Sequence, residues 1–203
     1  MSLPRLINIA AAEKLYSGLS GWKLADDTIT TYFNEHYPND KPSIVAVKVV
    51  LVSSLYYARI FEPLKMATHI VGLQGLDSEL RNGDINAVER IAQFNRYEMS
   101  FASKYAHFHN KEAFPLYDHF AAGAIAALQG KGFSYAKYTD YFDIITSFRQ
   151  RSDLVSTSWG VLDKYLWLYG QKRDLDKGKD VNKEVTALYR SPEGKILFED
   201  LEP

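Results

Sequence analysis

Lys104 and Asp118 are the two residues whose types and spacing could together perform a reaction. A neutral amine is a nucleophile, and a carboxylate stabilises a cation that develops during the reaction. An unperturbed lysine is neutral in only about one molecule in a few thousand at pH 7, since its pKa is near 10.4. Desolvation by the nearby rings of Phe101, Tyr105 and Phe108 would favour the neutral amine. The pattern therefore predicts a nucleophilic amine with a carboxylate close to it; the alternatives are an ordinary ion pair or two separate solvent-facing side chains.

Two helices must position these groups. Phe101, Tyr105 and Phe108 recur at three- and four-residue intervals, which predicts a helix over 97–109 with Lys104 at the edge of its aromatic stripe. Asn110 and Pro115 interrupt the chain, and a second helix is expected over 116–128. Asp118 then falls in its first turn, where the helix dipole favours a carboxylate. We therefore expect a helical hairpin that brings the lysine and the aspartate together.

A lysine on one helix followed by Pro115-Leu116-Tyr117-Asp118-His119 at the start of the next resembles the helix-hairpin-helix base-excision DNA glycosylase superfamily. The resemblance implies double-stranded DNA as the partner and glycosylase or lyase chemistry. Lys104 would be the Schiff-base lysine that attacks the sugar C1′, and Asp118 the catalytic carboxylate. The glycine-rich hairpin turn of that superfamily is absent, because the stretch from Gln93 to Ser103 contains no glycine.

Further residues are expected to contact the nucleic acid. A target base must leave the stack to be processed, and aromatic and imidazole side chains near Lys104 would receive it. These candidate substrate-binding residues are Tyr105, His107, Phe108, His109, Tyr117 and His119. Arg90, Arg96 and Lys111 are the candidates for contact with the DNA backbone, and the alternative for them is a solvated surface.

The histidines also raise the question of a metal, because imidazole and carboxylate groups bind zinc or iron. Side chains two residues apart on a helix point about 200° apart, so His107 and His109 cannot both be ligands on one helix. The chain contains no cysteine, which excludes disulfides and thiolate-held metals. We therefore expect neither a metal nor another cofactor.

The composition indicates a globular chain, and apolar residues that recur mainly at helical intervals favour an all-α fold. The chain has 203 residues, 46% of them hydrophobic, and a net charge of -1. About nine helices in one domain over 1–170 are expected, followed by a polar C-terminal extension over 171–203 in which Lys195 to Phe198 could form an edge strand. The expected helices are 5–18, 27–36, 42–61, one opening at Pro63, 78–81, 85–94, 97–109, 116–128, 134–149 and 153–169. The expected caps are Asp26-Asp27, Ser134 and Ser152 or Asp153, and Gly170 is the expected final stop.

Membrane association is not expected. The most apolar stretch, from Ile44 to Ile60, is interrupted by Lys48, Ser53, Ser54 and Arg59, and a membrane helix needs about 20 apolar residues. Leu6 to Ala12 is too short for a secretion signal, so a cytoplasmic protein is the expectation. The alternative function is a non-catalytic α-helical interaction protein of a bacterial stress or phage-response system, with a protein as its partner.

Overall fold

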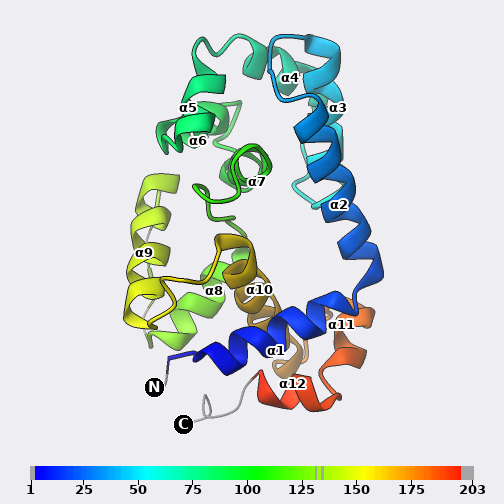
Figure 1. Cartoon of the computed structure of the whole chain (residues 1–203), viewed down its shortest axis with the longest axis vertical. Coiled ribbons are helices and arrows are strands. Elements are labelled where there is room, and N and C mark those ends of the chain that lie inside the picture. Colours follow the sequence, from blue (N-terminus) through cyan, green and yellow to red (C-terminus); the bar gives the residue numbers. More distant parts are fainter. Residues whose placement is uncertain (1–2, 131, 134, 198–203) are drawn as a thin grey trace. The chain divides into compact units, whose positions relative to one another are not determined.

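A computed structural model describes residues 3–130, 132, 133 and 135–197, and within them the chain forms twelve α-helices and no β-strand (Figure 1). The all-α prediction is confirmed, with more helices than the nine or so expected. None of the helices in this part of the chain is both long and apolar enough to cross a lipid bilayer. Their bounds are α1 Leu6–Ser17, α2 Ser20–Glu35, α3 Pro42–Leu55, α4 Pro63–Val71, α5 Leu76–Asn82, α6 Asn86–Ala92, α7 Met99–His109, α8 His119–Leu128, α9 Tyr138–Arg151, α10 Trp159–Asp176, α11 Lys183–Leu188 and α12 Pro192–Ile196.

The chain divides into two compact units. The first unit comprises Met1–Lys23, Asp118–Tyr135 and Phe142–Pro203, and the second comprises Leu24–Tyr117 and Ala136–Tyr141. Helices α2 and α9 each contribute residues to both units. This division differs from the expected single domain of residues 1–170 with an appended extension.

The first unit is built around α10, against which α1, α8 and α11 pack. Gly170 permits the closest of these approaches: a Cβ atom there would lie 2.4 Å from the carbonyl oxygen of Phe120 in α8. The indole rings of Trp22 and Trp167 meet edge to face at 4.9 Å. Gly170 therefore serves helix packing, and α10 continues through it to Asp176, where a stop had been expected.

Residues 171–197 belong to this unit and are not a polar extension. Val185 and Leu197 are fully buried, and the hydroxyl of Tyr189 donates to the carbonyl of Leu168 at 2.6 Å. Helix α12 packs on α1 (Figure 1), where the side-chain amide of Asn8 donates to the carbonyl of Ile196 at 2.9 Å. The expected edge strand is thus replaced by the end of α12, and Phe198 lies outside the described residues.

The second unit is built around α7. Every residue of this helix except Ser100 is buried, and α3, α5 and α6 pack against it. Helix α3 turns Val45, Val49 and Val52 inward, all fully buried, at the spacing that one helix face requires. Lys104 and its aromatic neighbours thus lie on the most enclosed helix of this unit.

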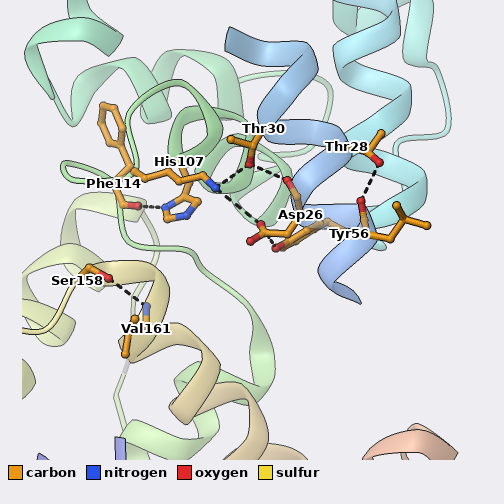
Figure 2. A network of polar contacts seen from close by, with 10 residues as sticks. Asp26, Thr28, Thr30, Tyr56, His107, Phe114, Ser158 and Val161 are labelled. Atoms are coloured by element: carbon orange, nitrogen blue, oxygen red, sulfur yellow. Dashed lines mark hydrogen bonds and ion pairs between the residues drawn. The ribbon is translucent and has the colours of Figure 1, made fainter. Parts of the chain in front are cut away.

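Helix boundaries follow caps and backbone conformation more closely than the distribution of apolar residues. Helix α3 ends at Leu55 rather than near residue 61, because Tyr57 and Arg59 adopt left-handed φ values of 52° and 51°. Helix α10 begins at Trp159 rather than 153, because the Ser158 hydroxyl caps it by accepting from the Val161 N–H at 3.4 Å (Figure 2).

Two other starts also differ from the expected ones. Helix α2 begins at Ser20 rather than 27, so the Asp26-Asp27 pair lies inside it and is not a cap. Helix α9 begins at Tyr138 rather than 134, and Ser134 lies outside the described residues. In both cases the expected cap was a polar residue near the true start, which shows how weakly a single polar residue fixes a helix end.

Candidate functional site

Lys104 occupies the expected place on α7. Lys104 is only 6% exposed, and its Nζ donates to the hydroxyl oxygen of Ser100, one turn earlier, at 2.9 Å. Phe101 and Tyr105 are fully buried on the same helix. The amine therefore lies in a mostly enclosed environment with a neutral hydroxyl as an acceptor.

Asp118 opens α8, although that helix begins three residues later than expected. Its backbone is extended, with φ −145° and ψ 168°, and its Oδ1 accepts the N–H of Ala121 at 2.7 Å. The residue is thus the N-cap of α8, the position where a carboxylate is favoured most. Asp118 belongs to the first unit and Lys104 to the second, so their pairing stays a prediction.

The segment that leads to Asp118 is fixed by side chains from the second unit. Each residue from 114 to 117 makes a backbone hydrogen bond to one of them. Phe114 O accepts from His107 Nδ1 at 2.7 Å, Pro115 O from Tyr138 OH at 2.8 Å, Leu116 O from Tyr141 OH at 2.9 Å, and the Tyr117 N–H donates to Ser103 Oγ at 3.0 Å (Figure 2 shows His107 and Phe114). His107 therefore positions this segment through its bond to a backbone carbonyl.

Four of the predicted substrate-binding residues are part of the core. The Tyr105 hydroxyl donates to Asn39 Oδ1, and the Phe108 ring meets Tyr56 edge to face at 5.1 Å. Together with His107 and His109, these side chains are buried. A base could reach them only if the second unit opened.

The other two predicted substrate-binding residues lie nearer the surface. Tyr117 is half-buried, with its ring edge to face against Tyr141 at 5.0 Å. His119 is exposed, and its ring centroid lies 3.9 Å from that of Phe120. Solvent reaches both residues, so they are the more accessible candidates for base contact.

The three predicted DNA-backbone residues differ in availability. Arg90 is ion-paired with Glu79 and donates to the carbonyl of Gln74 at 2.9 Å. Lys111 donates to the hydroxyl of Thr30 at 2.7 Å and lies 3.9 Å from Asp26, the carboxylate that accepts from Tyr56 in Figure 2. Arg96 has a side chain that is 78% exposed and lies 3.8 Å from a Glu98 oxygen. Arg96 is therefore the most accessible of the three.

A second buried lysine, which sequence reasoning missed as a site, lies in the same unit. Lys48 of α3 is fully buried, and its Nζ donates to the carbonyl of Tyr37 at 2.9 Å and to Asn39 Oδ1 at 3.1 Å. It also lies 3.5 Å from Nε2 of His109. The Asp77 carboxylate accepts from the Asn39 N–H at 3.1 Å and from its side-chain amide at 2.6 Å. We call Lys48, Asn39, Asp77, Tyr105 and His109 the Lys48 cluster.

The surroundings of the Lys48 cluster shift the pKa values of Lys48 and His109. Burial lowers the pKa of Lys48 to about 8, while the charges of Asp77 and Asp40 act in the opposite direction. Burial also lowers the pKa of His109 well below its usual value, and the Lys48 charge adds to that effect. His109 Nδ1 has no hydrogen-bond partner among the residues that the structure describes. The sequence did contain one signal for this cluster, since Lys48 is the only charged residue in the stretch of α3.

Within the described ranges, no three His, Cys, Asp or Glu side chains lie close enough together to hold a metal ion. His107 is engaged with the Phe114 carbonyl, and His119 is exposed on another helix, so neither histidine belongs to such a group.

Fold and site together define an all-helical protein with two buried lysines in one unit. The chain belongs to the HI_0787_N family, described as an N-terminal domain, which matches residues 8–113, just over half of the chain. An uncharacterized protein of Haemophilus influenzae is 31% identical over 134 residues, which cover 59% of this chain and 63% of that relative. The match thus spans less than two thirds of the relative's length. No solved structure matches the chain.

Proposed function

We propose that the protein binds DNA and performs glycosylase- or lyase-type base excision, with Lys104 as the nucleophile and Asp118 as the carboxylate. The observation that carries this proposal is the enclosed amine of Lys104, 6% exposed and hydrogen-bonded to a neutral serine hydroxyl. An amine attacks only when it is neutral, and enclosure in apolar surroundings favours the neutral form.

The order of elements supports the proposal. A lysine-bearing helix α7, an extended segment and an aspartate that caps α8 follow one another, as the resemblance to helix-hairpin-helix glycosylases implies. The four hydrogen bonds to residues 114–117 would fix the backbone just before Asp118. Such support of a reactive group by its surroundings is what a catalytic carboxylate requires.

The proposed reaction has two steps. Lys104 Nζ attacks C1′ of the target sugar, the C1′–N bond to the base breaks, and the electron pair leaves with the base. Asp118 stabilises the positive charge that develops on the sugar. The attached amine then passes one proton to the departed base, the C1′–O4′ bond breaks with its electron pair on O4′, and the second amine proton moves to O4′, which leaves an imine between Lys104 and C1′. At a pre-existing abasic site the amine instead condenses with the C1′ aldehyde and releases water.

Borohydride trapping tests the lysine. The wild-type protein mixed with duplex DNA that contains an abasic site is expected to form a covalent adduct when borohydride reduces the imine. Lys104→Met is expected to abolish the adduct, whereas Lys41→Met, which removes an exposed lysine of the same unit, is expected to retain it. Absence of a wild-type adduct on abasic and oxidised-base duplexes, or an equal adduct with Lys104→Met, overturns the proposal.

A matched pair of substitutions separates the catalytic role of Asp118 from its capping role. Asn caps a helix about as well as Asp, whereas Ala does not. Asp118→Asn is expected to slow base release at least about tenfold, because it removes the charge that stabilises the cation, while leaving thermal stability nearly unchanged. Asp118→Ala is expected to slow base release similarly and also to cost about 1 kcal/mol of stability. Full base release by Asp118→Asn contradicts the assignment.

The alternative function, a non-catalytic helical interaction protein, is favoured by a different observation. Tyr105, His107 and His109 are engaged inside the second unit rather than presented to a ligand. Binding to duplex DNA at low ionic strength distinguishes the two functions. Affinity that falls steeply with added salt supports the first function, and no detectable binding supports the second.

A further inference from the structure

Two neighbouring loops of the second unit form a surface that contains neither Lys104 nor Asp118, although it includes Arg96, a residue also predicted to contact the DNA backbone. Residues 56–62 connect α3 to α4, and residues 93–98 connect α6 to α7; we call them the loop pair. The side-chain amide of Asn95 donates to the Glu62 carboxylate at 3.1 Å. The Arg96 guanidinium lies 5.8 Å from the centroid of the Phe61 ring. These contacts hold the two loops side by side.

The loop pair and the start of α4 expose large apolar side chains. Phe61 is 80% exposed, Leu64 71% and Tyr57 66%. Single exposed apolar residues are common, but here three lie within eight positions of the chain, and large apolar patches mark interaction sites. Phe61 and Leu64 are the most exposed large hydrophobic side chains among the described residues.

Both loops hold an unusual backbone conformation. Tyr57, Arg59 and Asn95 adopt left-handed φ values of 52°, 51° and 51°, and Tyr97 has φ 22°. Such conformations cost non-glycine residues energy and cluster at functional sites. The loops are nevertheless fixed, since the Ile60 N–H donates to Ser53 Oγ at 2.8 Å and the Glu98 N–H to the Ala92 carbonyl at 2.8 Å. The exposed rings are therefore presented by a rigid backbone.

The charges around the rings favour an anionic partner. Arg59, Lys65 and Arg96 are exposed cations; Lys65 is ion-paired with Glu62 and Arg96 lies 3.8 Å from Glu98, so the three cations exceed the two carboxylates by one charge. Exposed rings interleaved with guanidinium groups are the composition of surfaces that bind single-stranded nucleic acid, where bases stack and cations contact phosphates.

We propose that the loop pair binds a single-stranded nucleic acid, with an unpaired base stacked on Phe61 and backbone phosphates contacted by Arg59 and Arg96. Stacking needs a flat ring with an accessible face, which Phe61 offers at 80% exposure. This surface does not include Lys104 or Asp118, so the inference goes beyond the proposed excision reaction and does not depend on its outcome.

Fluorescence anisotropy with a labelled twenty-residue oligothymidine at low ionic strength tests the proposal in the full-length protein. Phe61→Ala is expected to weaken binding at least about fivefold, because each stacked base contributes that much or more. Phe61→Tyr keeps a stacking ring and is expected to bind like the wild type. Leu24→Ala removes another exposed apolar side chain of the same unit, 68% exposed, and is expected to have no effect.

Two further measurements identify what is recognised. Phe61→Leu keeps apolar area without a ring, so it is expected to weaken binding as Phe61→Ala does. Heparin, a polyanion without bases, is expected to bind Phe61→Ala and the wild type equally. No binding of oligothymidine by the wild type, equal binding by Phe61→Ala, or full binding by Phe61→Leu overturns the proposal, and the last result shows an apolar contact in place of base stacking. Lys104→Met is expected to retain oligothymidine binding, so the two proposals can fail separately.

Discussion

The surroundings of the two buried lysines differ in how far along the chain their hydrogen bonds reach. Lys48 donates to acceptors in the loop after α2, the Tyr37 carbonyl and Asn39 Oδ1, and lies beside His109 of α7. Lys104 donates to Ser100, four residues earlier in its own helix. Lys48 therefore ties three segments of the second unit together, whereas the serine bond of Lys104 stays within one helical turn.

This difference separates a structural from a chemical use of a buried amine. Burying an ammonium group is costly unless its N–H groups find hydrogen-bond acceptors. Lys48 finds them in the Tyr37 carbonyl and Asn39 Oδ1. Removing it takes a donor from the half-buried Tyr37 carbonyl and from the buried Asn39 Oδ1. The Ser100 hydroxyl, which accepts from Lys104, is half-buried, so water can replace that one hydrogen bond when the lysine is removed.

The largest expected effect is therefore on stability at Lys48. Lys48→Met keeps the length of the side chain but leaves the Tyr37 carbonyl unsatisfied and removes one donor to Asn39. We expect it to lower the free energy of unfolding by about 3 kcal/mol, and Lys104→Met to lower it by about 1 kcal/mol or less. Urea unfolding followed by circular dichroism measures both. Equal losses of unfolding free energy in the two variants would show that the two lysines do not differ in their contribution to stability.

The pH dependence of stability provides the next largest effect. The pKa of Lys48 is about 8 in the folded protein and about 10.5 when unperturbed, because burial disfavours its charge. Between these values the unfolded chain binds more protons than the folded chain, so the contribution of Lys48 to stability rises with pH. The slope reaches at most about 1.4 kcal/mol per pH unit for one proton.

This effect can be measured below the range in which tyrosines interfere. Burial raises the pKa of Tyr105 and Tyr138, so these residues lower stability as the pH rises above about 10. Urea unfolding between pH 7.5 and 9.5 is expected to show the wild type gaining stability relative to Lys48→Met as the pH increases. A difference that stays constant across this range would mean that Lys48 keeps an ordinary pKa when folded.

The sequence predicted the class of fold and the helices near Lys104 because these depend on local periodicity. The stripe of Phe101, Tyr105 and Phe108 placed α7 to within two residues at its start, and Pro42 and Pro63 marked the first residues of α3 and α4. It failed where tertiary packing overrides a local signal. Gly170 looked like a helix stop, but it lies inside α10, where Phe120 packs against it.

The Lys48 cluster was beyond reach for the same reason. Asn39 and Asp77 lie 38 positions apart, and no local pattern indicates that they meet. Tyr57 and Arg59 adopt left-handed backbone conformations, which glycine or asparagine usually signals in a sequence. Neither residue is of these types, so the end of α3 and the exposed loop after it could not be foreseen. What sequence did offer was a lone lysine in an apolar helix, a sign that a buried charge needs distant partners.

The smallest expected effect concerns single hydroxyl groups and tests whether satisfied polar groups explain the Lys48 cluster. Tyr105 and Tyr165 are both fully buried, but the Tyr105 hydroxyl donates to Asn39 Oδ1, whereas the Tyr165 hydroxyl has no hydrogen-bond partner among the described residues. Tyr105→Phe is expected to lower the free energy of unfolding by about 1 kcal/mol, and Tyr165→Phe to leave it unchanged or raise it slightly. The midpoints of urea unfolding compare the two. If Tyr105→Phe proves neutral while Tyr165→Phe destabilises the protein, the hydrogen bonds of the cluster do not contribute as argued, and the structural role given to Lys48 loses its basis.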